Sequence, residues 1–356
     1  MDETPPIRVA VVGLGIGRVH VLAFKDVRRH YRVTTVCDVD GERAAEVAGW
    51  LRGVTPVTDL ADVLADDEVD VVDLCTPPHL HRAQVEAALR SGHDVFCEKP
   101  LAGSVAEIDE IASIADETGR TVMPILQYRF GHGIQKLRRV VDLGLAGRPY
   151  VANVDMAWLR GADYYAVPWR GRWATELGGT LVSHAVHALD MLLLVLGPPT
   201  SVFARTATLV NDVEVEDSAA ITFAFPSGAL AVMSVTLGSQ AEISRHRFTF
   251  EHLSAESGVE PYANGQEPWV FTAASGDAGQ RITEALAQPV DHPEDYAGIF
   301  ERYAVARAEG GPPPVTLAEV RTLLEVVTAV YASARSGREV ELPLPADHPL
   351  LSGWAP

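Results

Sequence analysis

The sequence predicts an α/β fold in two parts: a doubly wound parallel sheet at the N-terminus, then an α+β domain with a large, mainly antiparallel sheet. In residues 7–125, short β-branched runs alternate with helical stretches, which is the pattern of βαβ units. After Gln127 the strands become longer, and turn formers such as Pro226-Ser227-Gly228 separate them, as in antiparallel hairpins. The chain of 356 residues is also long enough for two domains.

Residues 1–126 are expected to form the parallel sheet and its helices. The strands of a doubly wound sheet are buried on both faces and therefore continuously apolar; we place them at 8–12, 32–37, 69–74, 95–97 and 121–125. The helices between them are expected at 42–51, 79–91 and 105–118. In the last of these helices, Ile108, Ile111 and Ala115 are spaced to lie on one face.

Residues 127–315 are expected to form the second domain, which binds substrate and mediates oligomerisation. Its predicted strands are 150–156, 202–208, 219–225 and 229–236, and its predicted helices are 134–142, 179–196 and 295–308. Successive strands joined by tight turns argue for an antiparallel sheet. A helix at about 316–337, ending at Gly337, is expected to pack back on the first domain, which would make that domain discontinuous.

The composition excludes several classes of partner. With 48 acidic and 29 basic residues, the formal charge of −19 repels nucleic acid and anionic membrane surfaces. The most apolar predicted helix is interrupted by Asp190 and ends at Gly197, so it is too short to span a membrane. Residues 1–6 carry acid and proline where a secretory signal carries base and an apolar run. The three cysteines are odd in number and fall in apolar runs, which indicates buried thiols in the cytoplasm: Cys37, Cys75 and Cys97.

A glycine-rich turn follows the first strand and is expected to bind a dinucleotide. In such a turn the backbone N–H groups and the helix N-terminus bind a pyrophosphate, here with Gly13, Gly15, Ile16 and Gly17. The spacing is G-x-G-x-G, one residue shorter than the usual fingerprint. Asp38 ends the second strand, where an acid accepts hydrogen bonds from the adenosine ribose; a helix cap or turn is the alternative role.

The same acid favours NAD over NADP as the cofactor. A carboxylate at Asp38 repels a 2′-phosphate, and Val39, rather than an arginine or serine, follows it.

Two further strand ends carry candidate residues for the cofactor site. Thr76-Pro77 ends one strand, and His81 lies in the helix that follows; we predict a wall of the nicotinamide pocket there rather than a metal site shared with His79. Glu98-Lys99-Pro100 ends the next strand. A lysine beside a nicotinamide is well placed to act on an alcohol.

Taken in this order, these motifs resemble the Gfo/Idh/MocA family of nicotinamide-dependent sugar and cyclitol oxidoreductases. Downstream, Gly178-Gly179-x-Leu181-x-x-x-x-x-His187-x-x-Asp190 is similar to the second signature of that family. The resemblance covers most of the chain. It implies an N-terminal Rossmann domain that binds NAD.

The resemblance also implies roles for individual residues. Glu98 would contact the nicotinamide ribose, Lys99 would touch both the cofactor and the reacting hydroxyl, and Pro100 would follow a cis peptide bond. His187 matches the catalytic histidine of the family, and an unperturbed pKa near 6.5 suits it as the base in oxidation. Many family members carry an acid four residues before that histidine, where this chain has Ser183, followed by His184. Which residue would pass the proton on from His187 therefore stays open.

His184 could face the same cavity as His187, three residues further along a helix. The two histidines could alternatively form a metal cluster with Asp190, although the resemblance implies no metal, and we predict none.

A loop at 160–173 is dense in aromatic and charged side chains, which suit the stacking and hydrogen bonding of a polyhydroxylated ring or, alternatively, a subunit interface. With a segment at the domain junction, it completes the predicted substrate residues: Arg129, Tyr165, Trp169, Arg170, Ser183, His184 and His187.

Together these observations predict an NAD-dependent dehydrogenase for a secondary hydroxyl of a sugar, glycoside or cyclitol, with Lys99 and His187 as catalytic residues. A glycoside hydrolase or lyase that oxidises the ring transiently with NAD, and a non-catalytic NAD-binding sensor, are the alternatives. We expect a homodimer or homotetramer.

Overall fold

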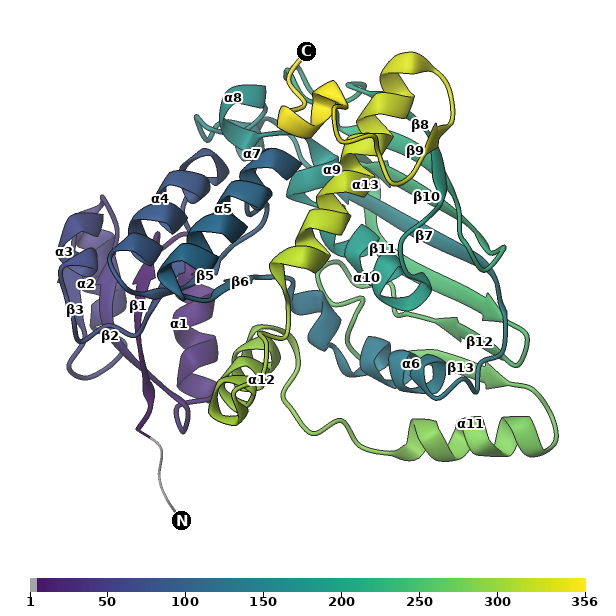
Figure 1. The fold of residues 1–356 in the computed structure, drawn as a ribbon, viewed down its shortest axis with the longest axis horizontal. Coiled ribbons are helices and arrows are strands. Elements are labelled where there is room, and N and C mark those ends of the chain that lie inside the picture. The colour runs from purple at the N-terminus through teal and green to yellow at the C-terminus, as the bar shows by residue number, and fades with distance from the viewer. Residues whose placement is uncertain (1–4) are drawn as a thin grey trace. The chain divides into compact units, whose positions relative to one another are not determined.

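The computed structural model describes residues 5–356, and its contacts divide the chain into two units (Figure 1). The first unit comprises the described residues up to Leu126 together with Tyr296–Val320, and the second comprises Gln127–Asp295 and Arg321–Pro356. Residues 1–4, on which the interpretation of the N-terminus partly depends, lie outside the described residues.

The first unit is built on a six-stranded parallel sheet with the order β3-β2-β1-β4-β5-β6. The strands are β1 (Ile7–Val12), β2 (Tyr31–Cys37), β3 (Thr55–Val57), β4 (Val71–Leu74), β5 (Asp94–Cys97) and β6 (Val122–Pro124). The strand order reverses between β1 and β4, which is where doubly wound sheets open a crevice for ligands. The predicted parallel sheet is confirmed, although the short edge strand β3 was not predicted.

Helices connect these strands: α1 (Gly17–Asp26), α2 (Gly41–Ala48), α3 (Leu60–Leu64), α4 (Pro78–Arg90) and α5 (Val105–Thr118). Local sequence explains where several of them begin and end. Ser104 caps α5 by accepting from the backbone N–H of Glu107, and Gly119 ends it with a left-handed φ of 64°. Figure 1 shows α4 and α5 side by side, with α4 packed on β4 and β5.

A helix from later in the chain, α12 (Asp295–Glu309), completes the first unit. Phe300 stacks on Phe24 and Phe96, with ring centroids 4.1 and 5.5 Å apart, and accepts a hydrogen bond at its backbone oxygen from the Tyr31 hydroxyl. The first unit is therefore discontinuous, but through a different segment from the predicted one. The returning segment is Tyr296–Val320, whereas the sequence placed it at 316–337. Most of that later helix, α13 (Leu317–Ser336), belongs to the second unit, because Tyr331 and Ser333 hydrogen-bond residues there.

The second unit contains an eight-stranded sheet with the order β13-β12-β11-β7-β10-β9-β8-β14. Its strands are β7 (Pro149–Leu159), β8 (Ser201–Ala207), β9 (Ser218–Ala224), β10 (Leu230–Thr236), β11 (Gly238–Phe250), β12 (Leu253–Glu256), β13 (Val270–Ala273) and β14 (Val340–Glu341). All neighbours are antiparallel except β7 and β10, which are parallel. The mainly antiparallel sheet is confirmed, but β11 to β14 were not predicted.

The helices of this unit include α6 (His132–Asp142), α10 (Val186–Leu196) and α11 (Asp277–Ala287). α10 packs on β7 and β11, and α11 packs on β13 and α6. On β9 and β10, buried and exposed side chains alternate along each strand, so one face of the sheet belongs to the core and the other is open.

The prediction of one helix over residues 179–196 is wrong. The structure has a short helix α9 (Thr180–Ser183), then a break at His184, whose φ and ψ of −125° and −58° are not helical, and then α10. In the part of the chain that the structure describes, no single helix is long and apolar enough to cross a bilayer; one bent pair, Trp173–Ser183 with Val186–Leu196, meets the test by length and composition alone.

Candidate active site

The glycines of the first turn differ in what their backbone and surroundings require. Gly13 has a φ of +88°, and a Cβ there would lie 2.6 Å from the Cys75 backbone oxygen. Gly17 opens α1, and a Cβ there would lie 3.0 Å from Val11 Cγ1. Gly15 faces open space, with nothing within 4 Å of an added Cβ. The turn is thus close-packed on one side and open at its middle, which fits the approach of a pyrophosphate to backbone N–H groups at a helix N-terminus.

Asp38 is buried and holds this turn in place. Its Oδ2 accepts from the Leu14 N–H at 2.8 Å, and its Oδ1 accepts from the Asp40 N–H at 2.9 Å. Arg43 Nη1 lies 3.2 Å from both carboxylate oxygens. Asp38 therefore does bind backbone N–H groups of two turns, as its alternative role requires, and its binding to ribose stays a prediction. Sequence reasoning missed Arg43, although its place one turn into the helix after Asp38 could have suggested the pair.

His81 joins two of the predicted cofactor turns. It is buried, with Nδ1 2.8 Å from the Pro100 carbonyl oxygen and Nε2 2.8 Å from the Thr76 carbonyl oxygen. Burial lowers the pKa of His81, although both carbonyl contacts favour its charged form. The Lys99–Pro100 peptide is cis, as the resemblance implies. His81 thus ties the Thr76-Pro77 turn to the Glu98-Lys99-Pro100 turn, and any contact between His81 and the cofactor stays a prediction.

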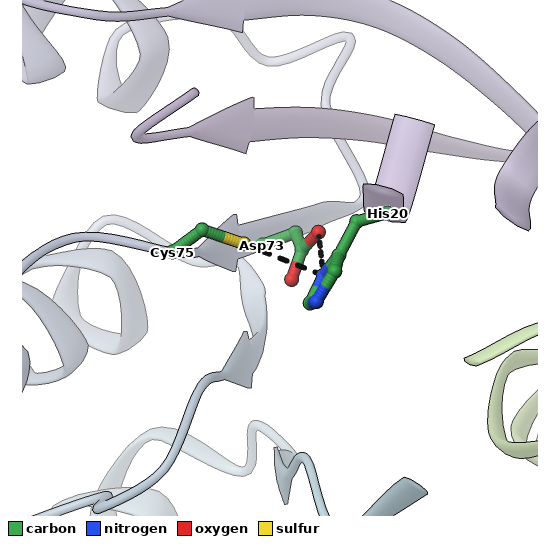
Figure 2. A group of neighbouring side chains, drawn as sticks. All are labelled: His20, Asp73 and Cys75. Atoms are coloured by element: carbon green, nitrogen blue, oxygen red, sulfur yellow. Dashed lines mark hydrogen bonds and ion pairs between the residues drawn. The ribbon is translucent and has the colours of Figure 1, made fainter. Parts of the chain in front are cut away.

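A buried group of side chains lies against the glycine turn. His20 on α1 lies beside Asp73 on β4 and Cys75 just after it, as Figure 2 shows. His20 Nδ1 is 2.8 Å from Asp73 Oδ2 and 3.3 Å from Cys75 Sγ, and its Nε2 is 3.1 Å from Glu98 Oε1. Sequence reasoning missed His20 and Asp73. An acid in a strand expected to be buried on both faces was the available signal, because a buried carboxylate needs a partner.

In the second unit, Glu216 fixes the signature Gly178-Gly179. Its carboxylate accepts from the N–H groups of Gly179 at 3.1 Å and Leu181 at 3.0 Å, and from the Tyr331 hydroxyl at 3.0 Å. A Cβ on Gly179 would lie 1.9 Å from the Glu216 backbone oxygen, so only glycine fits. Burial raises the pKa of Glu216 to about 7, despite these hydrogen bonds. Sequence reasoning did not identify Glu216.

The break between α9 and α10 separates the two candidate histidines. His184 lies in the break, and Ser183 Oγ, which donates to the Gly179 carbonyl, lies 2.8 Å from His184 Nδ1. His187 lies on α10, with its ring stacked on Tyr128 at 4.4 Å. His184 and His187 therefore do not lie on one continuous helix, and a cavity shared by the two side chains stays a prediction. Both histidines are buried.

Arg129 has a structural partner. Its Nε and Nη2 donate to the two carboxylate oxygens of Asp190 at 2.7 and 2.6 Å, and both residues are buried. This bidentate pair anchors the 3₁₀ turn Gln127–Phe130 to α10. The predicted substrate contact of Arg129 has to coexist with that pair.

The aromatic loop forms a cluster around Arg170. Its guanidinium lies over the rings of Tyr164 and Trp169, 3.8 and 4.3 Å from their centroids, and burial lowers its pKa. The Arg170 Nε is buried without a hydrogen-bond partner among the described residues. The centroid of the His184 ring lies 5.4 Å from that of Tyr164. Tyr165 is half-buried beside them, and this burial raises the pKa of its hydroxyl. The cluster therefore brings Trp169, Arg170 and His184 together.

The parallel sheet, its switch point and the glycine turn define the first unit as the Rossmann domain of a dinucleotide-dependent oxidoreductase. Residues 7–126 match the family described as oxidoreductase family, NAD-binding Rossmann fold, and residues 134–252 match the GFO/IDH/MocA C-terminal domain. The chain belongs to the Gfo/Idh/MocA family.

Three similar proteins illustrate the range of this family. The chain is 28% identical to D-xylose 1-dehydrogenase (NADP(+)) 2 of Haloferax volcanii, over 92% of this chain and 97% of that protein. It is 25% identical to myo-inositol 2-dehydrogenase of Thermotoga maritima, over 94% and 98%. The WlbA dehydrogenase of Bordetella pertussis, solved in complex with NADH and UDP-GlcNAcA, is 26% identical, with a TM-score of 0.82 over 96% of this chain and 100% of that one. The chain is thus an oxidoreductase related to sugar and inositol dehydrogenases.

Proposed function

We propose that this protein is an NAD-dependent dehydrogenase that oxidises a secondary hydroxyl of a sugar, glycoside or cyclitol. The observation that carries the proposal is the position of two turns at the carboxyl ends of the parallel strands. The glycine turn follows β1, and Glu98-Lys99-Pro100 follows β5, beside the point where the strand order reverses. Ligands of doubly wound sheets bind at such a point.

The proposed roles follow from the chemistry of alcohol oxidation. NAD, when bound, supplies the hydride acceptor. Lys99 orients the reacting hydroxyl and stabilises negative charge on its oxygen. His187 accepts the hydroxyl proton in oxidation and returns it in reduction. The remaining cofactor contacts are assigned to the glycine turn, Asp38, the Thr76–His81 turn and Glu98, and those of the substrate to the cluster around Arg170.

The substrate class is open to a direct screen. Purified protein is incubated with NAD or NADP and a panel of sugars, glycosides, inositols and nucleotide sugar acids, and the absorbance of reduced cofactor is followed. The nucleotide sugar acids are included because the related WlbA dehydrogenase was solved with UDP-GlcNAcA and because the buried Arg170 Nε could donate to an anion.

The same screen separates the alternatives. We expect reduced cofactor to accumulate in step with ketone or lactone, faster with NAD than with NADP. Release of an aglycone without net reduction of NAD would favour the transient-oxidation hydrolase instead. Tight NADH binding without turnover of any substrate, unchanged by Lys99→Ala, would favour a sensor.

We further propose that the open face of the second unit's sheet forms a homodimer or homotetramer interface. A hollow of about 500 Å³ on this face is lined by residues that include Phe203, Val232 and Arg245. Leu230 and Val232 are exposed on β10. Light scattering should give a multiple of the 38.3 kDa chain mass, and Val232→Glu should shift it toward the monomer. A monomeric wild type would refute this. The three buried free cysteines support a reducing, cytoplasmic location.

A further inference from the structure

His20 is a buried titratable residue to which the proposed function gives no role. It lies on the first turn of α1, three residues after Gly17, and its side chain is fully buried. Both of its ring nitrogens face carboxylate oxygens: Nδ1 faces Asp73 Oδ2 at 2.8 Å, and Nε2 faces Glu98 Oε1 at 3.1 Å. The three side chains come from different elements, so the contacts cross-link α1, β4 and the turn after β5.

These distances describe a hydrogen-bonded group better than a metal site. The ligand atoms of His20, Asp73 and Cys75 lie within 4.8 Å of one another. Figure 2 shows the three side chains as neighbours. Around a tetrahedral zinc, nitrogen and oxygen ligands lie about 3.3 Å apart. The 2.8 Å between His20 and Asp73 is shorter and has the length of a direct hydrogen bond. Burial also raises the pKa of the Cys75 thiol to about 12, which keeps its proton in place.

The charge of His20 follows from its partners. Ionised carboxylates only accept hydrogen bonds, so an imidazole that donates to two of them carries both protons and a positive charge. Burial is the largest single influence and lowers the pKa of His20, but the charges and hydrogen bonds of its neighbours, with Asp73 first among them, together outweigh burial, so the pKa lies well above its usual value. Asp73 Oδ1 is buried without a hydrogen-bond partner among the described residues. The imidazolium therefore compensates a carboxylate that would otherwise be costly to bury.

Glu98 is held from three sides by groups of the first unit. Its Oε1 faces His20 Nε2 and accepts from the Tyr296 hydroxyl at 3.0 Å, and its Oε2 accepts from the Lys99 N–H at 3.1 Å. His20 is the one of these donors that stands on α1, the helix whose N-terminus follows the glycine turn.

We propose that His20 is a positioning residue of the dinucleotide site, which fixes the Glu98 carboxylate for the nicotinamide half of the cofactor and joins it to the helix that receives the pyrophosphate. Asp73 orients the ring and balances its charge. The inference rests on the proposed function, because Glu98 is assigned there to the nicotinamide ribose. Loss of His20 should therefore weaken the binding of the nicotinamide half of the cofactor and leave the binding of the adenosine and pyrophosphate half unchanged.

The test compares two ligands in calorimetric titrations. NADH spans the whole site, whereas ADP occupies only the adenosine and pyrophosphate part. His20→Leu should weaken NADH binding about 10-fold, the loss expected for a hydrogen bond to a charged group, and leave ADP binding unchanged. His20→Gln, which can still donate to one carboxylate, should show an intermediate loss. In a Glu98→Gln background, His20→Leu should add little, because its effect passes through Glu98.

The matched control is His93, which is buried in the same unit and whose ring bonds, among residues 5–356, only the backbone carbonyl oxygens of Val69 and Leu64. His93→Leu should lower the unfolding temperature without changing the ratio of NADH to ADP affinity. If both His20 variants fail to fold, Asp73→Asn carries the test, with the same selective loss of NADH affinity expected.

Two kinds of result would overturn the inference. Equal losses for NADH and ADP, or an undiminished effect of His20→Leu in the Glu98→Gln background, would make His20 merely structural. An unchanged NADH affinity in a folded His20→Leu would remove the positioning role while leaving the proposed function intact. Failure of the wild type to bind NADH would instead refute the proposed function itself.

Discussion

The two units hold their motifs in different ways. In the first unit the predicted cofactor residues are turns at the ends of parallel strands, and these turns are held by close backbone packing at Gly13 and by side chains of the predicted residues themselves, Asp38 and His81. In the second unit side chains distant in sequence hold the helix break: Glu216 binds the N–H groups of Gly179 and Leu181, and Arg129 binds Asp190 on α10. A motif of the first kind can be read from local sequence. A motif of the second kind depends on partners that local sequence does not reveal.

The largest expected effect contrasts Lys99 with His187. Lys99→Met and His187→Asn should each lower kcat about 10³-fold, because one removes the charge that stabilises the oxyanion and the other removes the base. His187→Asn should leave the NADH dissociation constant unchanged, whereas Lys99→Met should weaken NADH binding. Steady-state kinetics and NADH fluorescence titration measure the two quantities. His252→Asn, on the turn after β11, is the control and should match the wild type in both quantities.

If His187→Asn retains more than a tenth of the wild-type kcat, His187 is not the catalytic base.

The next effect concerns the side-chain anchors of the second unit. Arg129→Met leaves the buried Asp190 carboxylate without its bidentate partner, which should lower the free energy of unfolding by about 3–5 kcal/mol. Arg129→Met/Asp190→Leu should recover part of that loss. Urea unfolding gives the values.

Arg82→Met is the control for this ion pair. Arg82 pairs with Glu86 and Glu110 on the surface of the first unit, so its loss should cost about 0–1 kcal/mol. Similar losses for the Arg129 and Arg82 variants would show that the buried pair has no special weight.

A third effect is the pH dependence carried by Glu216. Its pKa is about 7 in the folded protein and 4.5 for an ordinary glutamate, so between these values the folded state keeps a proton that the unfolded state has lost. This group therefore favours folding at pH below 4.5, and its contribution disappears as the pH rises through 7. From pH 5 to pH 8 the wild type should lose up to about 3 kcal/mol relative to Glu216→Gln. Urea unfolding at each pH gives the free energy of unfolding of both proteins. The prediction is contradicted if these two free energies change with pH in the same way.

The smallest effect probes the first unit. Asp38→Asn keeps an oxygen that can accept from the Leu14 N–H but removes the charge, so the preference for NAD over NADP should fall about 10-fold. The ratio of the two kcat/KM values measures this preference. Asp59→Asn, at the cap of α3, should lower stability and leave the ratio alone. An unchanged ratio in Asp38→Asn would assign the preference to other residues, with Arg43 the first to examine.

The sequence was sufficient for most of the first unit because its longer strands are largely apolar and the turns after β1, β4 and β5 carry glycine or proline. The edge strand β3 and the helix α3 were missed, since Thr55–Val57 and Leu60–Leu64 are too short to show a pattern. The helix predicted at 295–308 was assigned to the second domain, whereas nearly all of α12 belongs to the first unit. The second unit was harder. The helix break at His184 carries no glycine or proline, and the residues before it are bound at their backbone N–H groups by Glu216, 37 and 35 positions away.

The candidate site divides in the same way. Gly13, Gly15 and Gly17 could be assigned from their spacing, because a backbone requirement leaves a mark on residue type. His20, Asp73, Arg43 and Glu216 were not assigned, because their importance lies in contacts with residues between 5 and 115 positions away. Aromatic density did indicate the cluster around Arg170, since stacking needs no particular register, and its contact with substrate stays a prediction.

The parallel pairing of β7 with β10 has a consequence for biosynthesis. β7 occupies an interior position in the eight-stranded sheet, yet both of its neighbours, β10 and β11, come later in the chain. As the polypeptide leaves the ribosome, this strand emerges with both hydrogen-bonding edges unmatched and waits until β11 has been translated. During that interval the unpaired edges of β7 expose the nascent chain to aggregation.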